Sequence, residues 1–200
     1  MKHITSIANG IDGANERVGH LTCYLTVIMV AAGSFNAIVR WLSNLARIDP
    51  GADGLLDPLL RFVGETALAV NSNVFIELQW YLFSLVFLLG AAWTFRHDVH
   101  VRVDVIYARL SRRKKAWINI WGTALFLLPF CALIVWTSWP VVVDSWARLE
   151  GSPDPGGLPR YPLLTIIPLA FLLLMLQGLA ILLREVAVLR GISTDGAASE

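Results

Sequence analysis

Histidine and acidic side chains are the residues of this sequence whose types could do chemistry. His20 and His97 each flank a long apolar run, and histidines on facing membrane helices can hold haem. His97 also begins a cluster with Asp98, His100 and Asp104 whose residue types can bind metal ions. The cluster lacks two histidines spaced four residues apart on a helix and has no cysteine nearby. We therefore expect loop hydrogen bonds from it, not a metal site.

No catalytic centre can be assembled from the remaining residues. The sequence has no Gly-rich phosphate loop, and its apolar runs hold no nucleophile beside a base. Cys23 and Cys131 lie far apart in apolar stretches without a C-x-x-C pattern, which predicts small buried side chains and neither a disulfide nor a zinc site. We expect no enzyme activity, no metal and no cofactor.

The composition is that of a membrane protein. Apolar residues make up 56% of the 200 residues and charged residues only 16%, and the formal net charge is +1. This charge is too small to indicate a nucleic-acid partner.

Four uncharged runs are long enough to cross a bilayer, which requires about 20 apolar residues in a helix. They lie at 21–39, 78–95, 116–143 and 161–183, and they predict spans at about 21–40, 76–96, 116–143 and 161–184. Lipid offers no partner to backbone amides, so each run must be helical. The sequence therefore predicts an all-α integral membrane protein, with one membrane domain over residues 1–200 and four transmembrane helices.

These runs hold no ionisable group, whereas a carrier or redox enzyme acting alone should place such groups within its spans. Glu77 falls at a span boundary, where we expect a solvated charge. The notable polar residues within the runs are expected to form hydrogen bonds between helices; they are Asn36, Gln79, Asn119 and Gln177.

The positive charges predict the orientation of the chain. Of the 16 Lys and Arg residues, 11 lie in the N-terminal segment, at 96–115, which contains the predicted inner loop 97–115, and at 184–190. The other two segments between the runs, 40–77 and 144–160, hold the remaining five and contain the predicted outer loops 41–75 and 144–160. Because positive residues favour the cytoplasmic side, both termini are predicted to be cytoplasmic. The tail 191–200 is small and polar and is expected to be disordered.

Two loops contain amphipathic patterns that predict interfacial helices. In the first outer loop, Asp57 and Pro58 begin a helix with apolar residues on one face. In the inner loop, apolar residues recur at i, i+3, i+4 and i+7 in a basic context; they are Val103, Ile106, Tyr107 and Leu110. The basic residues predict attraction to anionic lipids, and a protein-docking role remains open.

Three motifs in this order resemble the small (Q-type) subunit of tripartite ATP-independent periplasmic (TRAP) transporters. The first is residues 77–111, in which a span leads into the HVRVD segment at 100–104. The second is LLPF at 127–130, followed by SWP at 138–140. The third is EGSPDPGGLPRYP at 150–162, which leads into the last span.

The resemblance implies a three-part uptake system in the bacterial inner membrane. A periplasmic substrate-binding protein would deliver an organic acid anion, and a large permease subunit would move it like an elevator with an ion gradient, usually of sodium. The small subunit would be a fixed scaffold. Two alternatives are a haem- or quinone-binding anchor of an oxidoreductase and a small multidrug carrier. A small multidrug carrier would need a buried carboxylate for proton-coupled export of cations, and the uncharged runs of this sequence have none.

The resemblance also suggests two functional segments. An inner motif is expected to contact the large subunit or lipid, together with the basic residues that follow it; the residues are Asp98, His100, Arg102, Asp104, Arg109, Arg112 and Arg113. An outer motif is expected to help dock the binding protein; it comprises Glu150, Gly156, Gly157 and Pro159. From composition alone, this Pro- and Gly-rich loop is instead a rigid turn.

Overall fold

The computed structural model describes residues 2–48, 62, 72–97, 107 and 109–190, and this part of the chain is helical without strands. Its elements are α1 (Lys2–Ile48), α3 (Ser72–Arg96), α5 (Arg112–Gly122), the π-helical η1 (Thr123–Leu127), α6 (Leu128–Arg148) and α7 (Tyr161–Leu189). Four helical stretches are long and apolar enough to cross a membrane. The predicted all-α class with four candidate spans is therefore confirmed.

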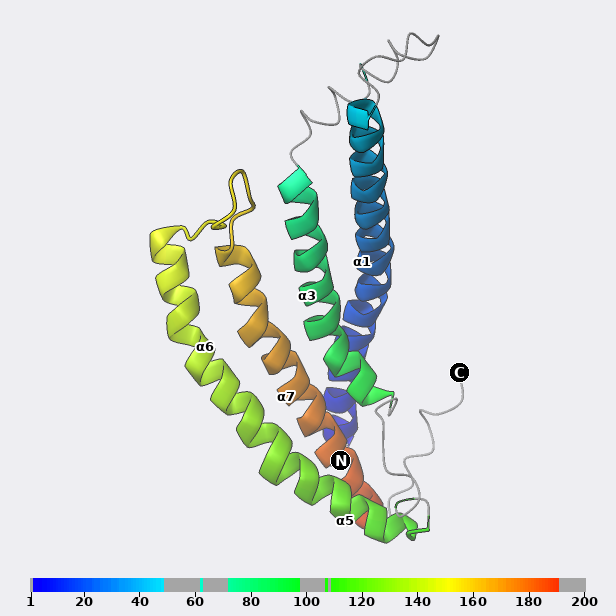
Figure 1. The fold of residues 1–200 in the computed structure, drawn as a ribbon. Helices are drawn as coiled ribbons and strands as arrows, with labels where there is room; N and C mark the ends of the chain where they lie inside the picture. Colours follow the sequence, from blue (N-terminus) through cyan, green and yellow to red (C-terminus); the bar gives the residue numbers. More distant parts are fainter. Residues whose placement is uncertain (1, 49–61, 63–71, 98–106, 108, 191–200) are drawn as a thin grey trace.

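Helix α7 is the centre of the bundle. It packs against α1 and α3 on one side and against α5 and α6 on the other (Figure 1). Small buried residues allow these helices to approach closely, because no bulky side chain separates the backbones. At Gly178, an added Cβ would come within 2.8 Å of the Leu127 side chain and 3.3 Å of that of Thr123.

Helices α5, η1 and α6 form one long, curved element (Figure 1). In η1, the Leu128 amide donates to the Thr123 carbonyl, five residues back instead of four. Pro129 follows directly and has no amide hydrogen to donate. The π turn and the proline together account for a bend at this point.

The helices extend beyond the uncharged runs from which the spans were predicted. Helix α1 has 47 residues, so it is about 70 Å long, whereas a bilayer with its headgroups is about 40–45 Å thick. Its N-terminal part continues through charged residues because those charges find partners on other helices, as described below. Helix α5 begins at Arg112, so Arg112 and Arg113 lie in its first turn and not in a loop.

Several expectations concern residues outside the described part of the chain. The amphipathic helix that was predicted to start at Asp57 lies there, apart from Phe62. Of the apolar residues that predicted the inner interfacial helix, only Tyr107 and Leu110 are described. Both interfacial helices therefore stay predictions, as does the C-terminal tail.

Substitutions at two glycines of α1 should show separately how close packing and helix propensity affect the stability of the protein. A Cβ on Gly19 would clash with Cδ1 of Trp93, whereas one on Gly13 would meet nothing within 4 Å. We expect Gly19→Val to lower the free energy of unfolding by about 1–3 kcal/mol through overpacking. Gly13→Ala should raise it by about 0.5–1 kcal/mol, since alanine favours a helix over glycine.

Denaturation in mild detergent would measure both effects. Trp93→Ala provides the control, because removing the indole should make Gly19→Val less costly. An equal cost of Gly19→Val with and without the Trp93 ring would contradict the proposed clash.

Candidate functional site

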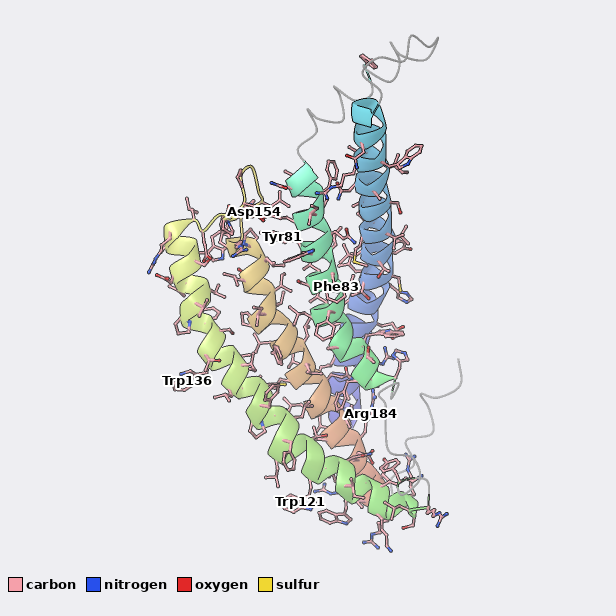
Figure 2. All side chains as sticks on the ribbon, viewed as in Figure 1. Tyr81, Phe83, Trp121, Trp136, Asp154 and Arg184 are labelled. Atoms are coloured by element: carbon pink, nitrogen blue, oxygen red, sulfur yellow. The ribbon has the colours of Figure 1, made fainter. Side chains whose placement is uncertain are left out.

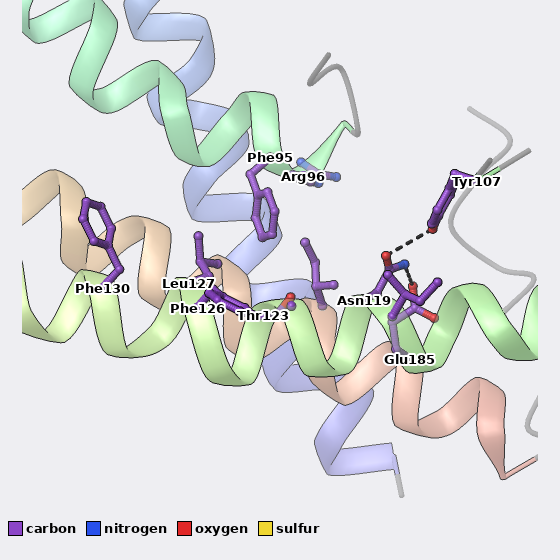
Figure 3. A pocket seen from close by; sticks show the side chains of 12 residues that line it. Phe95, Arg96, Tyr107, Asn119, Thr123, Phe126, Leu127, Phe130 and Glu185 are labelled. Carbon is purple, nitrogen blue, oxygen red and sulfur yellow. Dashed lines mark hydrogen bonds between the residues drawn. The ribbon is translucent and has the colours of Figure 1, made fainter. Parts of the chain in front are cut away.

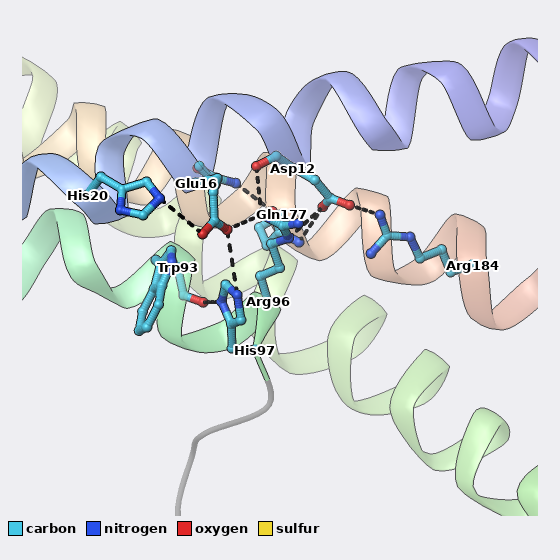
Figure 4. Close-up of polar contacts among 9 residues, drawn as sticks. Asp12, Glu16, His20, Trp93, Arg96, His97, Gln177 and Arg184 are labelled. Carbon is cyan, nitrogen blue, oxygen red and sulfur yellow. Dashed lines mark hydrogen bonds and ion pairs between the residues drawn. The ribbon is translucent and has the colours of Figure 1, made fainter. Parts of the chain in front are cut away.

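A cluster of charged and amide side chains joins α1, α3 and α7 near one end of the bundle (Figure 4). We call it the charge cluster; it comprises Asp12, Asn15, Glu16, Arg96, His97, Gln177 and Arg184. Its acid Asp12 is only 5% exposed, and the amides Asn15 and Gln177 are 1% and 0% exposed. Ionisable groups at such positions need partners, because an unpaired buried charge is costly.

Asp12 is the centre of the charge cluster. One carboxylate oxygen accepts a hydrogen bond from Nε2 of Gln177 at 3.0 Å and lies 3.8 Å from Nε of Arg96. The other oxygen pairs with the guanidinium of Arg184. Asn15 completes the contact with α7 by donating to Oε1 of Gln177 at 2.5 Å. One acid on α1 is thus bonded to side chains of both α3 and α7.

Glu16 connects α1 to the end of α3, one turn further along α1. It forms an ion pair with Arg96, which also donates to the backbone oxygen of Asp12 at 3.1 Å. Two histidines approach the Glu16 carboxylate, His97 at 3.5 Å and His20 at 3.6 Å. Nδ1 of His97 lies 3.0 Å from the Trp93 carbonyl, so this nitrogen must be the donor because a carbonyl can only accept.

The charge cluster was missed in the sequence because its residues lie outside the uncharged runs. Asp12, Glu16, Arg96 and Arg184 fall within the candidate spans of the structure. The expectation that no ionisable group is present concerned only the uncharged runs, and the helices that the structure shows are longer than those runs and include these four residues. A signal was present, since Asp12, Asn15, Glu16, Gly19 and His20 follow the i, i+3, i+4, i+7, i+8 spacing of one helical face.

The opposite end of the bundle has its own buried carboxylate, Glu77 of α3, which is 8% exposed. It accepts hydrogen bonds from the Ser152 hydroxyl and, at 2.5 Å, from the Leu158 amide. Tyr81, one turn along α3, donates to the Leu158 carbonyl at 3.2 Å. The expectation of a solvated Glu77 was wrong, because the loop between α6 and α7 folds over this carboxylate.

Residues 149–160, which we call the outer loop, owe their shape to a few local contacts. Leu149 and Gly156 have positive φ angles of 48° and 71°, a conformation that only glycine adopts without strain. Gly157 leaves no room for a side chain, since a Cβ there would lie 2.6 Å from a Glu77 oxygen. The backbone of Arg160 donates to the Glu150 carbonyl at 2.8 Å and closes the loop.

All four residues of the outer motif lie in the outer loop. Gly157 contacts Glu77, whereas Glu150, Gly156 and Pro159 are exposed. Exposed positions in the described part also include Arg109, Arg112 and Arg113. The inner motif lies outside the described residues; it comprises Asp98, His100, Arg102 and Asp104.

Two of the four amides that were expected to bond between helices do so. Gln177 binds side chains of α1, and Asn119 of α5 donates to Oε1 of Glu185 in α7 at 2.7 Å. Gln79 packs beside Gly33 of α1. Asn36 is buried, and its side-chain oxygen has no hydrogen-bond partner among the described residues.

The two histidines do not form a facing pair. Both rings are directed at Glu16, and the side chain of His20 is 71% exposed (Figure 4). The haem-anchor alternative therefore gains no support from their geometry. In the described part of the chain, no group of three or more His, Cys, Asp or Glu residues could hold a metal ion.

Comparison with known families decides the identity. Residues 59–188 match the family described as "Tripartite ATP-independent periplasmic transporters, DctQ component". The chain belongs to the DctQ family. This family is a component of a membrane transporter and not a family of enzymes, and its members work with a large membrane component and a periplasmic binding protein. No curated protein and no solved structure matched the chain.

The DctQ match covers the outer loop and every described helix except α1. It therefore includes Arg96, Gln177 and Arg184 of the charge cluster but not Asp12 or Glu16. The family assignment and the four candidate spans place the protein in the inner membrane.

Proposed function

We propose that this chain is the fixed scaffold of its transporter. It would support a large, ion-coupled elevator subunit in the uptake of an organic acid anion that a periplasmic binding protein delivers. The family match supports a role as the small permease subunit. The scaffold role is inferred from how the chain uses its buried charges.

The single observation that carries the proposal is the placement of the two buried carboxylates in the described part of the chain. Asp12 binds α1 to α3 and α7, and Glu77 binds α3 to the outer loop. A carboxylate that binds a transported ion must exchange its partners during the cycle. Both of these carboxylates are instead occupied by fixed protein partners, which suits a part that keeps its shape.

The proposal includes the orientation that the positive charges predict, with both termini in the cytoplasm. The outer loop would then face the periplasm and help dock the binding protein. The basic residues Arg109, Arg112 and Arg113 would face the cytoplasm near anionic lipid. The inner motif at 98–104 would hold the turn after α3 and contact the large subunit.

A cross-link within the bundle tests the scaffold role directly. A Cβ at Gly33 of α1 would lie 3.0–3.1 Å from the side-chain atoms of Gln79 in α3. Cysteines at these two positions, in a chain whose Cys23 and Cys131 are replaced by alanine, can be joined by a short reducible reagent. We expect the cross-linked complex to retain most of its sodium-dependent uptake in proteoliposomes, because a scaffold does not need α1 to move against α3.

The two single-cysteine variants, treated with the same reagent, control for modification alone. Loss of uptake upon cross-linking that a reductant restores would show that α1 and α3 move during transport, and the scaffold proposal would fail. Uptake by the large subunit and binding protein without this chain would also exclude the proposal.

A further inference from the structure

A cavity of about 800 Å³ lies between the end of α3, the α5–η1–α6 element and α7 (Figure 3). Its walls are mostly apolar along the turns from Ile118 to Phe130, a length of about 18 Å at 1.5 Å per residue. Phe126 and Phe130 line it and are 75% and 53% exposed. The cavity is therefore open on the side where these aromatic rings meet the surroundings of the bundle.

Polar groups gather at one end of this cavity. Asn119 accepts a hydrogen bond from Tyr107 at 3.1 Å and donates to Glu185 at 2.7 Å (Figure 3). Arg96 is already paired with Asp12 and Glu16. Among the described residues, Glu185 has this hydrogen bond but no cation within ion-pair distance. A carboxylate at the edge of a membrane cavity is favourable when a cation joins it.

Positive charge lies beside the same polar end. Nζ of Lys115 is 5.1 Å from the centre of the Tyr107 ring, and Arg112, Arg113 and Lys114 precede it on the same first turns of α5. At this end of the cavity, Glu185 can therefore bind a cationic group, and Lys115 beside it can attract an anionic group. An apolar passage continues from this end along α6.

We propose that this cavity binds one phospholipid with a primary ammonium headgroup. The ammonium would bind Glu185 and Asn119, the phosphate would face Lys115, and an acyl chain would lie along Phe126 and Phe130. A zwitterionic headgroup fits because it complements both signs of charge at the polar end. An acyl chain fits because the apolar walls open toward lipid.

Native mass spectrometry of the full chain, alone and in complex with the large subunit, tests this proposal. The delipidated protein would be offered phosphatidylethanolamine, phosphatidylcholine and phosphatidylglycerol with identical acyl chains. We expect one phosphatidylethanolamine to be retained in preference to the other two. Glu185→Gln should reduce that preference about tenfold, which corresponds to about 1.4 kcal/mol, because the ammonium loses its negatively charged hydrogen-bond acceptor.

A second variant tests the apolar part of the cavity. Gly122 lines it, and a Cβ there would meet nothing within 4 Å. Gly122→Leu should therefore fill the cavity without disturbing the fold and should displace the lipid. Gly90→Leu on α3 is the matched control, because Gly90 has the same open surroundings and does not line the cavity.

Three outcomes would overturn the proposal. They are equal retention of the three lipids, unchanged retention in Gly122→Leu, and absence of the lipid from the assembled complex because the large subunit fills the cavity. The proposal does not rest on the scaffold role. A failed cross-linking experiment would leave it intact, and its own failure would leave the scaffold role intact.

Discussion

Asp12→Ala is expected to lower the free energy of unfolding by about 3–5 kcal/mol, the range for removing one partner of a buried ion pair. The substitution leaves Arg96 and Arg184 without their shared carboxylate and removes the acceptor for Gln177. Equilibrium unfolding in mixed detergent micelles would measure the loss. The large effect is expected because Asp12 itself is only 5% exposed and its loss leaves Arg184 without its ion-pair partner.

Asp144→Ala is the matched control. Asp144 also pairs with an arginine, Arg148, but their side chains are 58% and 74% exposed, and exposed pairs contribute little. Asp12→Asn should be intermediate, since it keeps an oxygen for Gln177 and loses only the charge. Equal stability of Asp12→Ala and Asp144→Ala would mean that the charge cluster does not hold the helices together.

Gly157→Val should release the outer loop from α3. A Cβ at this position would lie 2.5 Å from Cβ of Ser152 and 2.6 Å from Oε2 of Glu77, so the loop must move away and the Leu158 amide loses its acceptor. We expect hydrogen exchange at the Leu158 amide to accelerate by about tenfold or more, the factor that corresponds to at least 1.4 kcal/mol of lost protection. If this loop docks the binding protein, uptake should fall in the same variant.

Gly151→Val is the matched control within the loop, because a Cβ at Gly151 would meet nothing within 4 Å. Glu77→Ala should reproduce the faster exchange without adding bulk. Normal exchange in Gly157→Val would contradict the packing described here. Faster exchange with normal uptake would retain the packing and exclude the docking role of the outer loop.

The four spans could be predicted because a helix needs about 20 apolar residues to cross a bilayer, and four uncharged runs of the sequence reach about this length. The limits of α1 could not be predicted in this way, because its charged N-terminal part is helical only with partners from α3 and α7. Asp12 and Arg184 are far apart in the sequence, and no local pattern pairs them. The one-sided spacing of Asp12, Asn15 and Glu16 predicts a polar helical face but not what covers it.

Glu77 illustrates the same limit at the other end. Its position at the end of an apolar run was read correctly from the sequence, and its environment was not. The hydroxyl and amide that bind it come from Ser152 and Leu158, in a loop 75 and 81 residues later. Such a contact depends on how α6 and α7 place the loop, and the composition of the loop indicated only a turn. On α6, Trp136 is 80% exposed and points away from the bundle (Figure 2).

The π turn of η1 is also the position in the α5–η1–α6 element where one residue could be deleted without turning the flanking helices away from α7. Each α-helical residue advances the direction of the side chains by about 100°, so losing one residue from α6 would rotate everything beyond it. Cys131 and Ser145, now buried, would then point elsewhere. The turn of η1 already holds one residue more than an α-helical turn, because its hydrogen bond runs five residues back instead of four. Omitting Ala124 would return this turn to α-helical geometry and leave the flanking helices facing α7 as they do now.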